Sequence, residues 1–373
     1  MPTAKPPIPS AMLQALELAA RGRLHCPPNP AVGCVLVGSD GAILGQGHTQ
    51  PVGQAHAEVM ALRDAAQKGH SVQGATAYVS LEPCSHQGRT GPCCDALIAA
   101  GIGKVVASTQ DPNPRVGGNG FARLRAAGVQ VEVGPGAEET RELNIGFFSR
   151  MVRGTPWVRM KAASSLDGRT ALPNGASQWI TSAAAREDGH AWRARACAIL
   201  TGIGTVLKDD PRLDVRLSDI RRQPTLVLID SRLETPTDAK LWGAAERKIL
   251  IYTASNDAAR REALAALGAD IIILPNPGGK VDLAAVLHDL GQREVNEVHV
   301  EAGHKLNGSL LREGLVDELL LYQAPLLLGE GPGIAALGPY TELAQGLRFE
   351  WVEASRIGMD MRMRARVAER DRF

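Results

Sequence analysis

Short apolar runs alternate with amphipathic segments along the first part of the chain. Residues 56–67 place Val59, Leu62 and Ala66 at helical spacing, and residues 75–82 have the length and composition of a strand. By the same criteria the sequence predicts further helices at 11–21, 93–100 and 120–127, and further strands at 31–38, 104–109 and 129–133. Such alternation is typical of an α/β domain, with helices packed on a sheet.

Between residues 135 and 155 the chain becomes polar and charged, which predicts a linker. A second alternating series follows, and no internal repeat relates the two parts. We therefore expect two unrelated α/β domains, at residues 10–150 and 155–373. In the second domain the pattern predicts a helix at 182–195 and strands at 157–163, 196–201, 225–229, 248–252, 270–274, 296–301, 322–329 and 359–367.

The composition is that of an ordinary globular protein, with 44% hydrophobic and 22% charged residues, which is enough for two hydrophobic cores. A formal net charge of +1, without a basic block, does not indicate nucleic acid or a membrane surface as a partner. No apolar run reaches the ~18 residues of a membrane span, and the N-terminus lacks the apolar core of a signal peptide. Six cysteines, three of them clustered with a histidine, favour a cytosolic metal site over a disulfide framework.

The most informative motif is H56-A-E58, followed by P83-C84 and by Cys93. One imidazole and two thiolates can hold zinc with three protein ligands, which leaves a fourth position for water and lowers the pKa of that water to about 7. Glu58 is placed to transfer protons rather than to bind metal. This arrangement indicates a deaminase of the nucleobase and nucleoside type, although here eight residues separate Cys84 from Cys93.

His56 and Cys93 both fall at predicted helix starts, where the helix dipole favours thiolate and hydroxide. Cys93 is the predicted ligand rather than Cys94, because neighbours on a helix point about 100° apart. Cys94 is expected to pack as a small buried group. The alternative is a closed structural zinc site with His86 or Cys94 as the fourth ligand, and the position of Glu58 argues against it.

Asn29 precedes the first predicted strand, in a P-N-P segment. Its amide offers both a donor and an acceptor, which suits contact with an amide-like base edge. A plain turn explains the residue equally well, since Asn-Pro favours turn initiation. His25, His48 and His70 are predicted to be ordinary surface or loop histidines.

Two glycine-containing turns follow predicted strands in the second half. Gly202, Gly204 and Thr205 come after the strand at 196–201, and residues 301–309 come after the strand at 296–301. Backbone N–H groups at such turns can hold a phosphate at the C-terminal ends of strands. Each turn alone is explained equally well as a tight turn that requires glycine. Two such turns in one domain favour a dinucleotide-binding site.

Three arginines and a serine supply further candidates. Ser231 and Arg232 follow the strand at 225–229, where they could contact an adenosine ribose or its 2′-phosphate. Arg193 and Arg216 could bind a substrate phosphate, which guanidinium groups do well. An ordinary solvated surface position is the alternative for both.

Several runs resemble the bifunctional deaminase/reductase family of riboflavin biosynthesis. N29-PAVGCVLV, H56-AEVMAL, S80-LEPCSHQGRTGPCCDALI and Q110-DPNP resemble its deaminase half. K161-AASSLDGRTA, S177-QWITS, T205-VLKDDPRLDVR, I229-DS and V300-EAG resemble its reductase half. These runs span nearly the whole chain and occur in the same order as in the family. The resemblance implies a cytidine-deaminase-like α/β/α fold at 10–150 and a dihydrofolate-reductase-like α/β fold at 155–373.

The resemblance also implies two consecutive reactions on a small phosphorylated pyrimidine. The 2-amino group of 2,5-diamino-6-(5-phosphoribosylamino)pyrimidin-4(3H)-one is first hydrolysed, with Zn²⁺ as cofactor. NADPH then reduces the ribosyl group to ribityl, which gives 5-amino-6-(5-phosphoribitylamino)uracil. A cytoplasmic homo-oligomer, dimer or tetramer, is expected, with neither nucleic acid nor membrane as partner.

By resemblance, the site residues fall into three groups. His56, Cys84 and Cys93 would bind zinc, with Glu58 as proton shuttle. The NADPH contacts would be Ala163, Trp179, Thr205, Asp209, Ser231, Gly303, His304, Lys305, Leu306, Asn307, Gly308 and Ser309, and the substrate contacts Ser177, Arg193, Leu213, Arg216 and Glu301, to which Asn29 is added. Lys161 and Asp209 are candidates for proton delivery. His304 departs from the family, whose turn often has a small residue or Pro there.

Three other hypotheses compete with the hypothesis of a bifunctional enzyme. A deaminase acting on nucleic acid would need basic patches or aromatic stacking surfaces, and the first half offers neither clearly. A zinc-stabilised binding module that senses NADPH would not depend on Glu58. A chain with one inactive half would lack residues that the chemistry needs, yet both halves carry them.

Overall fold

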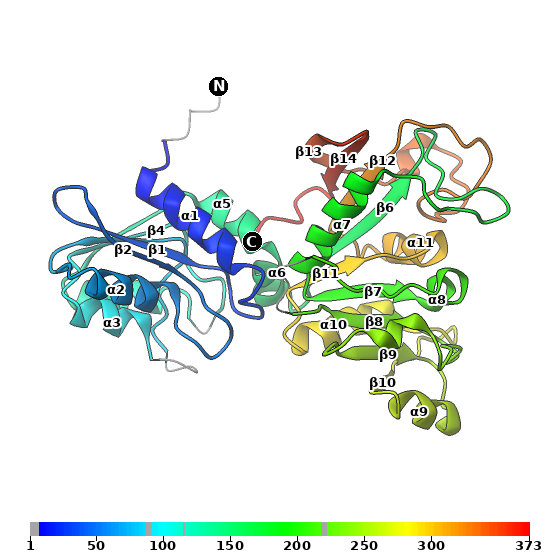
Figure 1. The fold of residues 1–373 in the computed structure, drawn as a ribbon, viewed down its shortest axis with the longest axis horizontal. Helices are drawn as coiled ribbons and strands as arrows, with labels where there is room; N and C mark the ends of the chain where they lie inside the picture. Colours follow the sequence, from blue (N-terminus) through cyan, green and yellow to red (C-terminus); the bar gives the residue numbers. More distant parts are fainter. Residues whose placement is uncertain (1–6, 87–90, 115, 218–221) are drawn as a thin grey trace. The chain divides into compact units, whose positions relative to one another are not determined.

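The computed structural model describes residues 7–86, 91–114, 116–217 and 222–373, in which the chain forms two compact units. The first unit ends at Arg153 and also includes Phe373, and the second spans Gly154–Arg372. Each unit has its own β-sheet, covered by helices (Figure 1). Among the described residues, no helix is long and apolar enough to cross a membrane.

The first unit has a five-stranded sheet in the order β2-β1-β3-β4-β5. Strand β1 pairs antiparallel with β2 and β3, whereas β3, β4 and β5 are parallel. The strands are β1 (Gly33–Val37), β2 (Ile43–His48), β3 (Thr76–Val79), β4 (Lys104–Ala107) and β5 (Gln130–Val133). The helices that alternate with them are α1 (Ser10–Gly22), α2 (Ala57–Gln67), α3 (Cys93–Ala99) and α4 (Asn119–Ala126).

Helices cover both faces of this sheet, because apolar side chains on β1 point to both sides. Val35 packs with Met12 of α1 on one face. Cys34 and Leu36 lie on the other face, in a core that includes Ala61 of α2. The unit therefore has the α/β/α layers that the sequence predicts.

Strand β2 was not predicted, because two glycines, Gly45 and Gly47, interrupt its apolar pattern. The structure gives these glycines a packing role. A Cβ on Gly45 would lie 2.3 Å from the carbonyl oxygen of Ala61, and one on Gly47 would lie 2.5 Å from the Cβ of Met60. Helix α2 therefore lies directly on the backbone of β2, and this close approach sets the position of the helix that begins after His56.

The predicted linker at 135–155 is wrong. The segment forms two helices, α5 (Ala137–Leu143) and α6 (Ile145–Arg153). In α6, Ile145, Phe147 and Phe148 are buried, so the polar residues there are one side of an amphipathic helix. Asn144 between the helices accepts a hydrogen bond from Ala31 N–H at 2.7 Å and donates one to Ala31 O at 2.9 Å.

The second unit has a nine-stranded sheet in the order β10-β9-β8-β7-β11-β6-β12-β14-β13. All pairs from β10 to β12 are parallel, whereas β14 and β13 are antiparallel. The strands are β6 (Trp157–Ser164), β7 (Ala198–Gly202), β8 (Thr225–Ile229), β9 (Ile249–Thr253), β10 (Ala269–Ile273), β11 (Glu297–Val300), β12 (Glu318–Gln323), β13 (Glu350–Ile357) and β14 (Asp360–Arg366). The helices are α7 (Ala183–Arg195), α8 (Ile203–Asp209), α9 (Ala258–Ala265), α10 (Leu283–Gln292) and α11 (His304–Arg312), with short 3-10 turns at Lys240–Gly243 and Leu343–Gln345.

Two apolar clusters form on opposite faces of this sheet. Val158 and Val300 pack with α10 and α11 on one face, and Ile199 packs with Val206 of α8 and Leu264 of α9 on the other. The predicted strand at 322–329 is wrong in extent. Strand β12 ends at Gln323, and the apolar residues that follow form a loop. Strand β13 was also missed.

Beneath α7 the sheet carries buried charged side chains beside a small apolar cluster that includes Leu320 and Tyr322 of β12. Arg159 of β6 is 1% exposed and pairs with Glu297 of β11 at 2.8 Å and with Glu318 of β12 at 2.5 Å. Arg366 of β14 continues the series to Glu318 at 2.8 Å. The ring of Trp192 from α7 lies 4.6 Å from the Arg159 guanidinium. We call Arg159, Trp192, Glu297, Glu318 and Arg366 the charged layer.

Candidate functional site

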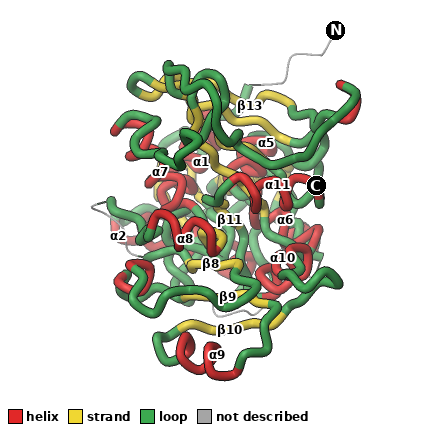
Figure 2. The backbone as a smooth tube through the Cα atoms, turned by 90° about the vertical axis from the view of Figure 1, so that its right-hand side faces the viewer, coloured by secondary structure: helices red, strands yellow, loops and turns green. Residues whose placement is uncertain are grey.

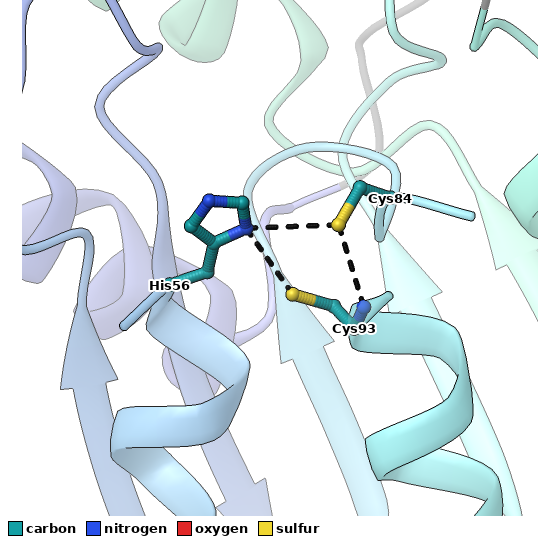
Figure 3. Close-up of side chains that lie close together, drawn as sticks. All are labelled: His56, Cys84 and Cys93. Atoms are coloured by element: carbon teal, nitrogen blue, oxygen red, sulfur yellow. Dashed lines mark hydrogen bonds between the residues drawn. The ribbon is translucent and has the colours of Figure 1, made fainter. Parts of the chain in front are cut away.

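In the first unit His56, Cys84 and Cys93 come together (Figure 3). His56 is the N-cap of α2, Cys93 is the first residue of α3, and Cys84 lies in the loop after β3. The His56 Nδ1 atom lies 3.3 Å from Cys93 Sγ and 3.6 Å from Cys84 Sγ. The Cys93 backbone N–H donates a hydrogen bond to Cys84 Sγ at 3.3 Å.

The donor set fits zinc in both chemistry and spacing. All three ligand atoms lie within 4.8 Å of one another. Zinc bonds of roughly 2.0 Å to nitrogen and 2.3 Å to sulfur at tetrahedral angles place these atoms about 3.5 Å apart, close to the nitrogen–sulfur distances in the cluster. The pKa of Cys84 is lowered, chiefly because the Cys93 thiol donates a hydrogen bond to its sulfur. Thiolate, the form that binds metal, is therefore favoured at Cys84.

Glu58 follows His56 in the first turn of α2 and is only 3% exposed. Burial raises the pKa of its carboxyl from 4.5 to about 7, and the negative charge of Cys84 adds to the shift. At neutral pH this group can therefore both accept and donate a proton. Such a carboxyl beside a metal cluster is suited to acid–base work on a water and a leaving group.

Cys94 is not one of the clustered zinc-ligand candidates, which are His56, Cys84 and Cys93. Its thiol donates to the carbonyl oxygens of Pro83 at 3.1 Å and Gly120 at 3.5 Å, and burial raises its pKa to about 12, so it stays a thiol. Among the described residues the cluster has three members, and neither Cys94 nor His86 is a fourth. This arrangement favours an open site over a closed structural one.

Glu82 fixes the loop beside the cluster, and the sequence analysis missed it. Its carboxylate is 4% exposed and accepts backbone N–H groups of Asp111, Gly118, Gly120 and Phe121 at 3.1, 2.9, 2.8 and 3.2 Å. A buried carboxylate is commonly satisfied by several backbone donors near a helix start. The L81-E-P-C84 segment could have indicated it, because an acidic residue there interrupts an otherwise apolar run.

The other polar candidates of the first unit have local roles. Asn29 lies in a turn where its N–H donates to Cys26 O at 2.9 Å, and its binding role stays a prediction. The Nδ1 atoms of His48 and His70 lie 3.1 and 2.9 Å from the carbonyl oxygens of Thr49 and Leu44. His25 is not in the metal cluster.

In the second unit the predicted site residues gather at one edge of the sheet. The parallel register puts the ends of β6, β7, β8 and β11 at the same edge, where α8 and α11 begin (Figure 1). Figure 2 looks onto this end, which is rich in loops. Gly202 is the N-cap of α8, and a Cβ there would lie 3.0 Å from Leu306 of α11. The two glycine-containing turns therefore lie side by side.

The predicted NADPH residues lie in different structural settings. Thr205 and Asp209 lie in α8, and His304, Lys305, Leu306, Asn307, Gly308 and Ser309 are the first six residues of α11, after its N-cap Gly303. Ser231 Oγ accepts a hydrogen bond from Val281 N–H at 3.2 Å. Ala163 lies in β6 opposite Tyr322, whereas Trp179 is 69% exposed. Arg232 pairs with Glu234 at 3.1 Å.

Three of the proposed substrate residues belong to one polar cluster. Arg193 of α7 makes two hydrogen bonds to Glu301, which follows β11, and its Nη1 donates to Asp214 O at 3.0 Å. Arg216 Nη1 donates to Asp214 Oδ1 at 2.6 Å. The Arg193 guanidinium holds the pKa of Glu301 well below its usual range against the effect of burial.

Two further predicted substrate contacts lie in loops. Leu213 belongs to the same loop as Asp214, and Ser177 lies in the loop that precedes α7.

Lys161 of β6 is a partly buried cation that forms no ion pair with the described residues. Burial lowers the pKa of its ammonium, and the nearby Arg193 charge lowers it further. No carboxylate lies within 4.0 Å of its Nζ among the described residues, and the ring of Tyr322 lies 5.9 Å away. An ammonium of lowered pKa in a polar site is suited to donating a proton.

The sequence analysis missed other polar groups here, although the pattern contained a signal. Strand β11 and the next residue read E297-V-H-V-E301, with charged or titratable side chains at alternate positions of a buried strand. His299 is 1% exposed, and its Nε2 lies 3.5 Å from Glu301. His190 also faces the cluster, and burial lowers its pKa to about 4.

The two folds and their sites define a class of two-domain enzyme, a zinc deaminase joined to a reductase domain. Residues 8–109 match the family described as cytidine and deoxycytidylate deaminase zinc-binding region, and residues 156–363 match the RibD C-terminal domain. The riboflavin biosynthesis protein RibD of Escherichia coli (strain K12) is 45% identical over 94% of this chain and 96% of its own. The chain belongs to the RibD family of riboflavin biosynthesis proteins, which are bifunctional deaminases and reductases.

Solved structures confirm the predicted fold class. A structure of Acinetobacter baumannii RibD superimposes with a TM-score of 0.87 at 42% identity, covering 96% of this chain and 98% of that one. A diaminohydroxyphosphoribosylaminopyrimidine deaminase/5-amino-6-(5-phosphoribosylamino)uracil reductase from Thermotoga maritima gives a TM-score of 0.85 at 32% identity, with 96% and 98% covered. The first unit is thus cytidine-deaminase-like and the second is the dihydrofolate-reductase-like domain of this family.

Proposed function

We propose that this chain catalyses two consecutive steps of riboflavin biosynthesis. The first is hydrolytic deamination of 2,5-diamino-6-(5-phosphoribosylamino)pyrimidin-4(3H)-one, and the second is NADPH-dependent reduction of the ribosyl group, which gives 5-amino-6-(5-phosphoribitylamino)uracil. The observation that carries the first step is the buried Glu58 carboxyl, with a pKa of about 7, beside three ligand atoms spaced for zinc. Family membership supports the pairing with a reductase.

For deamination, His56, Cys84 and Cys93 would hold Zn²⁺, which lowers the pKa of a water so that it becomes a nucleophile at neutral pH. The Glu58 carboxylate would accept a proton from the attacking water as its oxygen bonds to C2 of the pyrimidine. The protonated Glu58 then gives its proton to the 2-amino nitrogen, the C–N bond breaks, and ammonia leaves. One carboxyl therefore serves both proton transfers, for which a pKa near neutrality is suited.

For reduction, the ribose ring opens so that C1′ becomes an imine-like carbon. NADPH, when bound, would be the source of the hydride for that carbon, and we assign its contacts to the predicted residues of α8, α11, Ser231, Ala163 and Trp179. Lys161 delivers the proton to the nitrogen attached to C1′, with Asp209 as the second candidate. Arg193 and Arg216 bind the phosphate of the substrate, and Glu301 orients Arg193 through their paired hydrogen bonds.

We also propose a cytoplasmic homo-oligomer, a dimer or tetramer. Strand β13 lies at the edge of the second sheet and exposes 69% of Trp351 and 42% of Val352, and apolar edge strands are commonly covered in an assembly. Light scattering after gel filtration tests this proposal directly. A monomer at all concentrations would contradict it.

The central experiment follows NADPH oxidation by its absorbance, with zinc-loaded and zinc-stripped protein. The zinc-loaded chain should oxidise NADPH when given the diaminopyrimidine ribotide. The stripped chain should do so only when given the deaminated ribotide, because only the first step needs zinc. Absence of oxidation with either substrate would exclude the reductase, and ammonia release would then test the deaminase alone.

A further inference from the structure

The loop at residues 210–216 has a backbone conformation that its own sequence does not favour. Leu213 has φ 52° and Asp210 has φ 38°, in the left-handed region that residues with a Cβ rarely adopt. Leu213 is nevertheless 4% exposed and has neither glycine's freedom nor the side-chain hydrogen bonding of asparagine. Its conformation must therefore be imposed by the groups around it.

A single buried side chain contacts the peptide groups on both sides of Leu213. Arg247, at the start of the segment leading into β9, is 9% exposed. Its Nη1 donates to the carbonyl oxygen of Arg212 at 2.7 Å and to that of Leu213 at 2.9 Å. These two carbonyls belong to the peptide planes that define φ and ψ of Leu213, so one guanidinium nitrogen constrains both angles. Its Nη2 donates to Leu241 O.

Arg247 lacks the usual partner of a buried cation. No carboxylate lies within 4.0 Å of its guanidinium in the part of the chain that the structure describes, and burial lowers its pKa to about 10. A buried guanidinium bound only to carbonyl oxygens is costly to keep charged. Its presence is explained if the geometry of the loop matters more than local stability.

The loop in turn sets the two cations proposed to bind substrate. Asp214 follows Leu213 directly and is 4% exposed. Its carbonyl oxygen accepts from Arg193 at 3.0 Å, and its carboxylate accepts from Arg216 at 2.6 Å. Rotation about the backbone of Leu213 would therefore move both guanidinium groups relative to each other. Two guanidinium groups at a set spacing are suited to a phosphate dianion.

We propose that Arg247 is a positioning residue for the reductase step: it holds Leu213 in its left-handed conformation and so sets the spacing of Arg193 and Arg216 for the phosphate of the substrate. This rests on the proposed function of the second unit. Arg247 itself is buried beneath the loop and does not contact the substrate. Its removal should affect binding of the phosphorylated substrate while leaving NADPH binding and the deaminase unchanged.

The test compares Arg247→Met with Arg260→Met in the full zinc-loaded chain. Arg260 is a matched control, because its guanidinium also donates to two loop carbonyls, those of Leu233 at 3.0 Å and Thr235 at 2.7 Å. For Arg247→Met we expect the KM for the deaminated ribotide to rise about tenfold, equivalent to about 1.4 kcal/mol. Calorimetric binding of inorganic phosphate should weaken by a similar factor, whereas the Kd for NADPH stays within twofold.

The outcomes are distinguishable. An unchanged KM and phosphate affinity in Arg247→Met, or an equal loss of NADPH and ribotide binding, would overturn the proposal. So would a tenfold rise in ribotide KM in Arg260→Met, because loss of any arginine that donates to loop carbonyls would then have the same effect. If Arg247→Met does not fold, Arg247→Lys should raise the KM at least threefold, and no change would refute the role. Phosphate binding by a wild-type chain that never oxidises NADPH would refute the proposed function alone.

Discussion

Replacing Glu58 separates the chemistry of deamination from metal binding. Glu58 performs both proton transfers in the proposed mechanism, and a positioned acid or base contributes about 10²–10⁴ in rate. With both transfers lost, we expect Glu58→Gln to lower the rate of ammonia release by at least about 10⁴, or roughly 5.5 kcal/mol in activation free energy. The zinc ligands are untouched, so the metal content should stay at one ion per chain.

The same substitution has a calculable effect on stability. Burial raises the pKa of Glu58 from 4.5 to about 7, so ionising it costs roughly 3 kcal/mol more in the folded zinc-free chain than in the unfolded chain. Because the unfolded chain loses this proton at lower pH, the stability of the zinc-free protein should fall as pH rises from 4.5 to about 7 and then level off. Glu58→Gln should remove that fall.

The assay measures ammonia release, zinc content, NADPH oxidation with deaminated ribotide, and urea unfolding of the zinc-free chain at several pH values. Glu139→Gln is the control, since Glu139 is exposed in the first turn of α5. Its ammonia release should match that of the wild type. Ammonia release within tenfold of the wild type in Glu58→Gln would refute the proton-shuttle assignment, and simultaneous loss of NADPH oxidation would refute independent sites.

Three further predictions concern single residues. Cys93→Ala should lose both bound zinc and deaminase activity. Cys94→Ala should keep both and lose about 1 kcal/mol of folding stability. Equal zinc content in the two variants would contradict the assignment of Cys93 as the ligand. Arg216→Ala should raise the KM for the ribotide about tenfold without changing NADPH affinity, and equal weakening of both would indicate a role in the fold. Burial lowers the pKa of His190 to about 4. As pH falls below 6.5, this histidine therefore gains a proton in the unfolded chain before it does so in the folded chain, and the protein loses stability on acidification. His190→Gln should reduce that loss in urea unfolding between about pH 7 and pH 5.

The helices and the zinc-ligand cluster could be predicted where the sequence signal is local. Helices α2 and α3 begin next to His56 and at Cys93, as the apolar periodicity indicates, and the three ligand atoms do come together. A motif with a histidine and two cysteines carries its chemistry in the residue types themselves. The catalytic roles of the residues in this motif remain predictions, which the variants above test.

What could not be predicted depends on contacts between distant segments. Strand β2 resembles a loop because Gly45 and Gly47 serve the close approach of α2, and α6 resembles a linker until its apolar side is seen to be buried. The conformation of Leu213 is imposed by Arg247, more than thirty positions later. Local propensity contains no information about such a contact.

The charged layer beneath α7 constrains how the second unit can change over evolutionary time. In an apolar core, one side chain can be exchanged for another of similar volume at small cost. In this layer, loss of Arg159 alone would leave Glu297 and Glu318 buried with fewer partners, which typically costs about 3–5 kcal/mol. A viable change here therefore requires coordinated replacement of Arg159 and its carboxylate partners, whereas a position in an apolar core can change alone.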